Sequence, residues 1–264
     1  MSPLGWLDVT DLDFNALLLL EPFHADYISQ RQPDKDIGTA LNAHPAVQWY
    51  LEQIFPPIKT FIADCLALAD QNPTSAQIRT AEIAVMDSMQ DWLIYVLDPE
   101  KYDQLDFLKW DNSSLLEMTD FNDKVVLDIG AGTGRLAFAA APRARYVFAI
   151  EPVANLRRFI LKKSHALGFQ NIYPLDGFIT QIPLPDQFAD ILMAGHVFGD
   201  DLQNEYQELV RVVKDGGVIL LHPGTNAGSE DDAHHFLVSR GFSFDYFEEP
   251  KDGIKRKYWK MINK

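Results

Sequence analysis

Three glycines at alternate positions, Gly130, Gly132 and Gly134, follow an apolar run that contains a single acid, Asp128. Glycine allows a sharp turn and leaves no Cβ atom between the backbone and a ligand. The helix that follows such a turn offers free backbone N–H groups to a negatively charged ligand group. A carboxylate at the end of the preceding strand suits a ligand that carries positive charge. The stretch therefore predicts a ligand-binding turn with Asp128 beside the ligand.

Two more acids come where further strands are expected to end. Glu151 lies in the sequence AIEP, 17 residues after Gly134, and Asp176 lies in LDG. A nucleotide-type cofactor needs an acid at the end of the second strand to accept hydrogen bonds from its ribose hydroxyls, and Glu151 is placed for that role. Asp176 is placed to accept a hydrogen bond from an adenine amino group. Ligands of open α/β sheets bind beyond the carboxyl ends of the strands, so the acids are expected to meet at that edge.

The elements that would position these acids follow from the rhythm of the chain after residue 120. Apolar runs of five to seven residues alternate there with helical stretches. This alternation predicts an α/β fold with a doubly wound, mostly parallel sheet covered by helices on both faces. Strands are expected over 125–130, 146–152, 171–177, 188–195 and 218–224, and helices over 135–141, 154–167, 201–213 (closed by Gly216 and Gly217) and 231–240. The last two runs, 242–249 and 255–262, are joined by a short turn around Asp252 and Gly253, which predicts an antiparallel C-terminal hairpin and a total of seven strands.

The first part of the chain has a different character. Residues 1–37 are expected to be irregular, and helical patterning starts near His44. Prolines and a capping-box pattern divide the rest into helices over 44–55, 58–69 and 74–98, with a short helix over 113–119. We therefore expect an N-terminal helical region over residues 1–110 and an α/β domain over residues 111–264.

Charge separates the same two parts. Residues 1–120 carry 6 Lys and Arg against 20 Asp and Glu, whereas residues 121–264 carry 17 against 18. The net charge of −15 makes the chain a poor binder of nucleic acid, because phosphate backbones select clustered Lys and Arg. The single cysteine, Cys65, allows no disulfide within the chain, and no apolar run is long enough to span a bilayer. These features predict a cytoplasmic protein with no nucleic-acid or membrane partner.

Taken together, the motifs resemble a known family. The pattern D-x-G-x-G-x-G over residues 128–134, Glu151 in AIEP, Asp176 in LDG, and the stretches IPLPDQFADIL and LVRVVKDGGVILL are similar to those of the class I S-adenosylmethionine-dependent methyltransferases. The resemblance covers residues 121–264, including the closing hairpin. It implies a Rossmann-like fold, S-adenosyl-L-methionine as cofactor, and transfer of a methyl group to an acceptor.

The resemblance also implies which residues hold this cofactor. The glycine turn would lie under its methionine part with Asp128 in the same pocket, and Glu151 would accept hydrogen bonds from both ribose hydroxyls. Residues 176–178 would hold the adenine, and residues 195–197 would face the sulfonium and the acceptor entrance. The cofactor-binding residues implied in this way are Asp128, Gly130, Ala131, Gly132, Gly134, Glu151, Pro152, Asp176, Gly177, Phe178, Gly195 and His196.

A nicotinamide dinucleotide is the rival cofactor. Its binding turn prefers the pattern G-x-G-x-x-G. Here the third glycine, Gly134, comes one residue early and Arg135 follows it, while Asp128 precedes the first glycine by two residues. S-adenosylmethionine is therefore favoured over NAD(P), and a methyltransferase over an NAD(P)-dependent oxidoreductase.

Methyl transfer is an in-line displacement that needs an aligned acceptor and, for some acceptors, a general base. His196 is the candidate base, because it follows the fourth strand and imidazole titrates near neutral pH. The alternative is that His196 packs or forms hydrogen bonds in a loop. His222, after the fifth strand, is the second candidate. His234 and His235 are neighbours on a helix and point to different sides, so no metal site is expected.

The N-terminal helices are expected to cover the carboxyl edge of the sheet and to form a pocket for a small-molecule acceptor. Trp92, Tyr102 and Trp110 are candidates for aromatic walls of this pocket, although such residues more often pack in a core. The acidic charge favours a neutral or cationic acceptor over a phosphorylated one. A methyltransferase-like protein that binds the cofactor without turnover is the alternative function.

Overall fold

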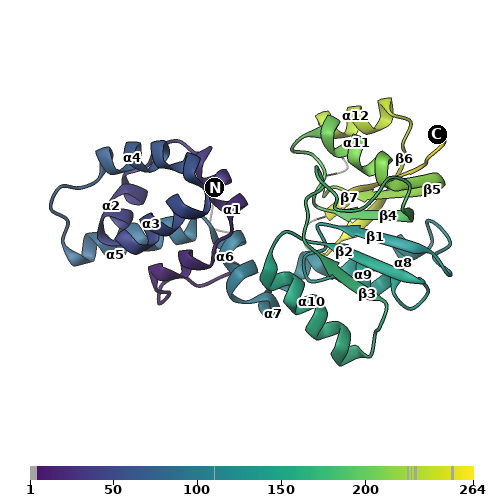
Figure 1. The fold of residues 1–264 in the computed structure, drawn as a ribbon, viewed down its shortest axis with the longest axis horizontal. Helices are drawn as coiled ribbons and strands as arrows, with labels where there is room; N and C mark the ends of the chain where they lie inside the picture. Colours follow the sequence, from purple (N-terminus) through teal and green to yellow (C-terminus); the bar gives the residue numbers. More distant parts are fainter. Residues whose placement is uncertain (1–4, 110, 225, 227, 229–230, 251–252) are drawn as a thin grey trace. The chain divides into compact units, whose positions relative to one another are not determined.

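The structure, a computed structural model, describes residues 5–109, 111–224, 226, 228, 231–250 and 253–264. The chain divides into two compact units, Met1–Tyr102 and Asp103–Lys264, and each is described by itself (Figure 1). The domain boundary expected after residue 110 stays a prediction.

The C-terminal unit is an α/β domain built on one sheet. Its strands are β1 (Val125–Ile129), β2 (Tyr146–Ile150), β3 (Ile172–Leu175), β4 (Ala189–Gly195), β5 (Val213–His222), β6 (Ser243–Glu249) and β7 (Gly253–Met261). Within the described residues these seven strands follow the order β3-β2-β1-β4-β5-β7-β6. Strands β1 to β5 pair in parallel, and β7 pairs antiparallel with both β5 and β6. The predicted mostly parallel sheet with an antiparallel C-terminal hairpin is therefore confirmed.

Helices cover both faces of this sheet (Figure 1). They are η3 (Asp106–Leu108), α8 (Ser113–Leu116), α9 (Arg135–Ala140), α10 (Ala154–Leu167), α11 (Leu202–Val212) and α12 (Asp232–Ser239). Val126 of β1 joins a buried cluster with Leu136 of α9 and Ile160 of α10. Its neighbour Leu127 points to the other face and joins a cluster with Leu209 of α11. The strand order reverses between β1 and β4, so their carboxyl ends flank the point where ligands bind in sheets of this kind.

The two glycines expected to close the helix over 201–213 lie inside a strand instead. Helix α11 passes directly into β5, which contains Gly216 and Gly217. Gly216 has a φ of +75°, and a Cβ atom on Gly217 would lie 2.9 Å from the carbonyl oxygen of Asp190. The register between β4 and β5 shifts at this place. The glycines therefore form an irregularity that lets β5 pair closely with β4. The helix ends at Val212, close to the expected end, but the expectation that these glycines close it was wrong.

The described residues of the N-terminal unit form helices without strands (Figure 1). They are η1 (Phe14–Leu19), α1 (Pro22–Ser29), α2 (Lys35–Ala43), α3 (Pro45–Ile54), η2 (Pro56–Ile58), α4 (Lys59–Leu68), α5 (Ser75–Asp87), α6 (Gln90–Leu97) and α7 (Pro99–Tyr102). The expectation that residues 1–37 are irregular is wrong, because η1, α1 and the start of α2 lie there. Asp34 caps α2 by accepting hydrogen bonds from two backbone N–H groups, and Glu21 forms a capping box with His24 at α1.

The helix expected over 74–98 is two helices, α5 and α6, which separate at Ser88 and Met89. The hydroxyl of Ser88 donates to the carbonyl of Val85 at 2.7 Å, and Arg31 donates to the carbonyl of Ser88 at 2.9 Å. These bonds divert backbone carbonyls from the helical pattern. Since Arg31 comes from a distant part of the chain, the apolar periodicity of the segment carries no sign of the break.

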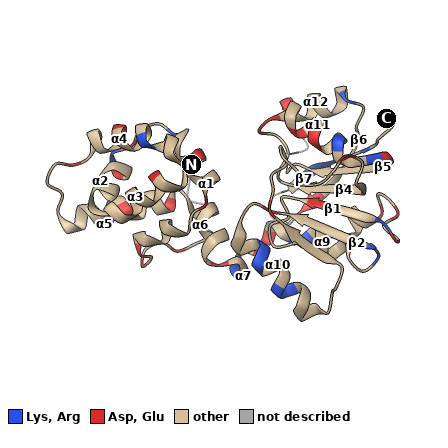
Figure 2. Cartoon of the chain, viewed as in Figure 1, with Lys and Arg blue, Asp and Glu red and all other residues tan. Residues whose placement is uncertain are grey.

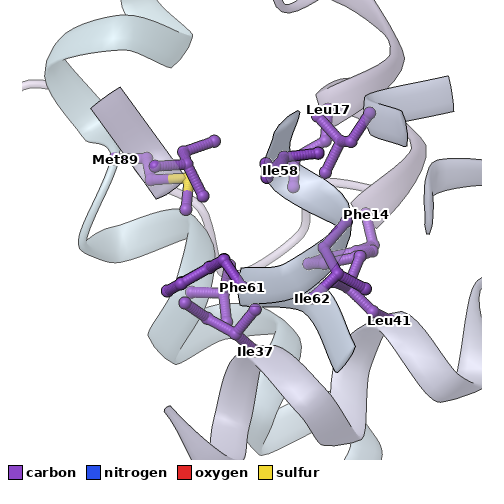
Figure 3. A pocket seen from close by; sticks show the side chains of 11 residues that line it. Phe14, Leu17, Ile37, Leu41, Ile58, Phe61, Ile62 and Met89 are labelled. Carbon is purple, nitrogen blue, oxygen red and sulfur yellow. The ribbon is translucent and has the colours of Figure 1, made fainter. Parts of the chain in front are cut away.

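The N-terminal unit has its own apolar core. Its helices surround a cavity of about 10 Å³, roughly the space of one water molecule (Figure 3). The lining side chains are all apolar, among them Phe14, Leu41, Ile62 and Met89. A cavity of this size without polar groups is a packing gap in a core, and it offers no site for a ligand.

Helices α2 and α4 cross at Gly38. A Cβ atom on Gly38 would lie 2.0 Å from the carbonyl oxygen of Cys65. Alanine is the better helix former by about 1 kcal/mol, yet it would force the two helices apart here. We expect Gly38→Ala to lower the free energy of unfolding by about 1–3 kcal/mol, measured by chemical denaturation.

Asn42→Ala is the matched control, because Asn42 lies on an exposed position of the same helix. We expect it to change the free energy of unfolding by no more than about 0.5 kcal/mol. A Gly38→Ala protein as stable as the wild type would show that the helices do not cross at this glycine.

Candidate active site

The glycine turn adopts a backbone that only glycine takes up easily. Gly130, Gly132 and Gly134 have φ angles of +63°, +56° and +82°, in the left-handed region. A Cβ atom on Gly130 would lie 2.1 Å from a methyl group of Val197, which follows β4. The turn after β1 therefore packs against the segment after β4, at the point where the strand order reverses. The sequence prediction of a tight turn between β1 and α9 is confirmed.

Glu151 faces this turn from the end of β2. Its side chain is buried, with 5% of the residue exposed. The backbone N–H of Gly132 donates to Oε2 of Glu151 at 2.8 Å, and that of Val153 donates to Oε1 at 2.9 Å. Both carboxylate oxygens of Glu151 are therefore held by backbone N–H groups at the edge of the glycine turn.

Asp128 is buried more deeply than the sequence indicated. Only 1% of the residue is exposed, and Oδ2 accepts a hydrogen bond from the N–H of Ala137 at 2.8 Å. One N–H group of the first turn of α9 is therefore taken by the chain itself. Burial raises the pKa of Asp128 to about 7, and the Glu151 carboxylate adds to this rise, whereas the Ala137 hydrogen bond and the Arg135 guanidinium oppose it.

Asp176 follows β3 at the same edge of the sheet. Its side chain is 70% exposed, and Oδ1 accepts from Nη1 of Arg157 at 3.1 Å. The same nitrogen donates to the carbonyls of Glu151 and Pro152, both at 2.7 Å. Arg157 thus links the segments that follow β2 and β3. Sequence reasoning missed Arg157, because a cation in a helix resembles an ordinary surface residue.

Gly177 and Phe178 follow Asp176 after the end of β3. A Cβ atom on Gly177 would lie 2.6 Å from the ring of Pro183 and 3.0 Å from a methyl group of Ile150, so the backbone lies close to both. Phe178 beside it is one of the exposed large apolar residues. An exposed aromatic ring next to an exposed carboxylate suits a flat, polar ring such as adenine.

His196 follows β4 in a left-handed conformation, with a φ of +57°. Its backbone N–H donates to the carbonyl of His222 at 2.8 Å, and its Nε2 lies 2.7 Å from Oε1 of Glu249. The side chain of His196 is 34% exposed. Left-handed backbone at a residue other than glycine is costly and is common at functional sites. Glu249 was missed in the sequence, because it lies 53 residues away in an antiparallel strand.

His222 and His234 contact aromatic side chains within the protein. His222 is fully buried, and its ring lies edge-on to Phe247 with the centroids 5.2 Å apart. Burial lowers the pKa of His222 to about 3, with smaller effects from nearby cations. His234 lies 3.0 Å from the hydroxyl of Tyr258. These contacts favour packing roles over proton removal. No cluster of three metal-ligating side chains occurs among the residues that the structure describes.

The candidate wall residues have neighbours of their own in the N-terminal unit. Tyr102 is buried, and its ring packs against those of Trp6 and Tyr95. Trp92 lies beneath the guanidinium of Arg31, 5.4 Å from the ring centroid. Trp110 lies outside the described residues. The expected cap over the sheet stays a prediction.

The charges at the turn fit one of the two cofactor classes better. Asp128 and Glu151 place two buried carboxylates next to the bare backbone of the glycine turn. A pyrophosphate would be repelled by them, whereas a sulfonium and an ammonium group would be attracted. The fold and these acids define a Rossmann-like domain whose site suits a cationic, nucleotide-type ligand.

Comparison with known proteins identifies the domain. Residues 127–221 match the family described as a methyltransferase domain. A segment of 109 residues is 34% identical to protein arginine N-methyltransferase 1 of Oryza sativa subsp. indica and covers 38% of this chain and 27% of that protein. A segment of 99 residues is 30% identical to the uncharacterized methyltransferase YcgJ of Bacillus subtilis (strain 168) and covers 36% of this chain and 39% of that protein.

A solved structure shows the same fold. The SAM dependent methyltransferase from Aquifex aeolicus matches with a TM-score of 0.50 and 21% identity, over 63% of this chain and 99% of that chain. The C-terminal unit therefore contains a class I, Rossmann-like methyltransferase domain, and this family implies S-adenosyl-L-methionine as cofactor. The chain spans well under half the length of the two curated relatives. No helix in the described ranges has the length and apolar character needed to cross a bilayer.

Asp128→Asn tests the buried charge, because asparagine keeps an oxygen for the Ala137 N–H but loses the titration. The folded-state pKa of about 7 lies above the ordinary 3.8, so folding takes up a proton between these values. In the wild type, the free energy of unfolding should therefore lose up to about 1.4 kcal/mol per unit as pH rises through this interval. We expect Asp128→Asn to abolish this contribution and to gain stability relative to the wild type from pH 5 to pH 8.

Asp190→Asn is the control with the opposite sign. Burial raises the pKa of Asp190. Hydrogen bonds from Lys214 and from the N–H of Val125, both 2.8 Å long, lower it by more, so the pKa of Asp190 lies below its ordinary value. Asp190→Asn should lose stability at neutral pH, and its deficit should shrink in acid. Denaturant unfolding from about pH 3 to about pH 8 measures both variants, because the Asp190 effect changes only at the acid end of this range. Parallel curves for Asp128→Asn and the wild type would contradict the buried-charge assignment.

Proposed function

We propose that this chain is an S-adenosylmethionine-dependent methyltransferase that acts on a small-molecule acceptor by in-line displacement. The family match over residues 127–221 supports this proposal. The observation that carries it is the position of Glu151, whose buried carboxylate is hydrogen-bonded to the N–H of Gly132. An acid that meets the glycine turn at the end of the second strand suits the ribose diol of an adenosyl group.

The proposal assigns each part of the ligand to residues of this chain. The glycine turn and Asp128 would bind the methionine part, and Glu151 would orient the ribose. Asp176, with the backbone of Gly177 and the ring of Phe178, would hold the adenine. When bound, the cofactor supplies a methyl group on a positively charged sulfur, which is already a strong electrophile. The chain's own task is to orient the acceptor, exclude water and, for some acceptors, remove a proton.

His196 is the residue proposed for proton removal. It follows the central strand β4, and the turn packs against its neighbour Val197. Its side chain is partly exposed, as a base that reaches a ligand must be. An imidazole that accepts the acceptor's proton in the transition state contributes about 100-fold or more to the rate.

The charge of the N-terminal unit bears on the acceptor. Figure 2 shows Asp and Glu distributed over its helices. An acidic surface favours a neutral or cationic acceptor over a phosphorylated one. A segment of 109 residues is similar to a protein arginine N-methyltransferase. Guanidinium compounds are therefore one cationic class to include in an acceptor screen.

Two other functions differ from this proposal in what they predict. A non-catalytic protein would bind S-adenosylmethionine and form no S-adenosylhomocysteine with any acceptor. An NAD(P)-dependent oxidoreductase would bind the dinucleotide instead. Calorimetry of the full chain with S-adenosylmethionine, S-adenosylhomocysteine and NAD distinguishes the oxidoreductase from the methyltransferase and from the non-catalytic protein. We expect micromolar binding of both adenosyl ligands and none of NAD, and the reverse result would exclude a methyltransferase.

Glu151→Gln tests the ribose assignment. A charged hydrogen bond in a buried site is worth about 1.5–3 kcal/mol, so we expect affinity for S-adenosylhomocysteine to fall about ten- to a hundredfold. Asp245→Asn, at an exposed position of β6, removes one negative charge elsewhere and should leave the affinity unchanged. Thermal unfolding of both variants checks that the fold persists. An unchanged affinity in a folded Glu151→Gln protein would place the ribose elsewhere.

A further inference from the structure

The segment that joins β3 to β4 has no helix of its own. The structure describes residues 176–188 throughout, and β4 follows β3 directly in the order of helices and strands. The first three residues of this segment are those proposed above to hold the adenine. Backbone groups outside helices and strands need other hydrogen-bond partners when they are shielded from water. The position of the segment therefore depends on the partners that the rest of the domain offers to its backbone.

A carboxylate and a guanidinium on α11 hold the middle of this segment. Nε of Arg211 donates to Oε1 of Glu208 at 2.7 Å, and Nη2 donates to Oε2 at 2.8 Å, so the two side chains form a bidentate pair. The backbone N–H of Ile182 donates to Oε2 of Glu208 at 2.9 Å. The carbonyl of Ile182 accepts from Nη2 of Arg211, also at 2.9 Å. Both backbone polar groups of Ile182 are therefore bound to α11.

The same guanidinium reaches further along the segment. Nη1 of Arg211 donates to the carbonyl of Leu184 at 2.8 Å and to Oδ1 of Asp186 at 2.9 Å. The side chain of Arg211 is 30% exposed and that of Glu208 is 20% exposed. The hydrogen bond from Arg211 lowers the pKa of Glu208 below its ordinary value, although burial opposes this effect. The pair is therefore charged at neutral pH, and hydrogen bonds of charged groups are the stronger kind.

Pro183 connects these bonds to the proposed adenine site. It lies between the two residues whose carbonyls Arg211 binds. A Cβ atom on Gly177 would lie 2.6 Å from the ring of Pro183 and 3.0 Å from a methyl group of Ile150 at the end of β2. The backbone at Gly177 thus packs directly against the anchored proline.

A pair of backbone hydrogen bonds makes a second connection. The N–H of Phe178 donates to the carbonyl of Gln181 at 3.4 Å, and the N–H of Gln181 donates to the carbonyl of Phe178 at 3.0 Å. Gln181 directly precedes Ile182, whose backbone α11 binds. Since close-packed contacts transmit displacements, a shift of residues 182–184 would move the backbone at Gly177 and Phe178 as well.

We propose that Glu208 and Arg211 are positioning residues that give the domain its preference for an adenine base. They do so by fixing residues 182–184 and, through them, residues 176–178. The proposal rests on the methyltransferase function above, which assigns residues 176–178 to the adenine. A carboxylate accepts a hydrogen bond from an amino group but receives none from an oxo group, so a fixed Asp176 can distinguish the two. Without the anchor on α11, this distinction would be lost.

S-inosylhomocysteine, which carries an oxo group in place of the adenine amino group, is the probe for this preference. By calorimetry, the wild-type full chain should bind S-adenosylhomocysteine about tenfold more tightly than S-inosylhomocysteine. Arg211→Lys keeps the charge but loses the planar fork that binds Glu208 and the two carbonyls. We expect it to reduce the ratio of the two affinities to about twofold or less, mainly through weaker binding of S-adenosylhomocysteine. Glu208→Gln should have the same effect.

Arg143→Lys is the matched control, because it makes the same substitution at an exposed position before β2. It should keep the wild-type ratio, and thermal unfolding checks that every variant is folded. A purely structural role would weaken the binding of both ligands equally. An unchanged ratio in folded Arg211→Lys and Glu208→Gln proteins would therefore overturn the proposal, as would a wild type that binds both ligands equally well.

Amide hydrogen exchange of the full chain gives a readout that needs no ligand. We expect the amide of Ile182 to exchange at least about tenfold faster in Arg211→Lys than in the wild type, with the amides of β1 unchanged. Equal rates at Ile182 would overturn the proposal, because the pair would then not fix the segment. Failure of the wild type to bind S-adenosylhomocysteine would instead refute the methyltransferase function, and the exchange rates would still decide whether α11 anchors the segment.

Discussion

The site depends on one hydrogen bond, from the N–H of Gly132 to the carboxylate of Glu151. It joins the turn after β1 to the end of β2, and the N–H of Val153 holds the other carboxylate oxygen. The left-handed backbone of Gly132 allows this N–H to meet the acid. Because the two strands are paired along their whole length, the turn and the acid form one rigid edge of the sheet.

Burial of charge at this edge has consequences for ligand choice. Asp128 is surrounded by protein, and the nearby Glu151 makes its ionisation more costly. A ligand with positive charge lowers this cost, whereas an anionic ligand raises it. On the other side of the β1–β4 switch point, Glu249 is buried next to Lys255 and contacts the partly exposed imidazole of His196. Under the proposed function, Asp128 and Glu151 would face the cofactor on one side of this switch point, and His196 lies on the other.

Features that depend on neighbouring residues could be predicted from the sequence, whereas features that depend on distant contacts could not. The strands, the terminal hairpin and the acids that follow β2 and β3 could be predicted, since each depends on a pattern of a few neighbouring residues. The break between α5 and α6 could not, because Arg31 reaches it from the segment between α1 and α2, far away in the sequence. The two glycines in β5 were misread as a helix end, because an irregular strand and a helix terminus use the same residue.

The sequence by itself determined the order of the strands along the chain, the glycine turn and the presence of an acid after each of the first strands. These follow from apolar periodicity and from the steric freedom of glycine, both of which are local. Only the tertiary structure decided that Asp128 is enclosed by protein, that Arg157 links two strand ends, and that Glu249 meets His196. Burial and pairing depend on residues that the packing of the sheet brings together from distant positions in the chain, and no local pattern of residues records them.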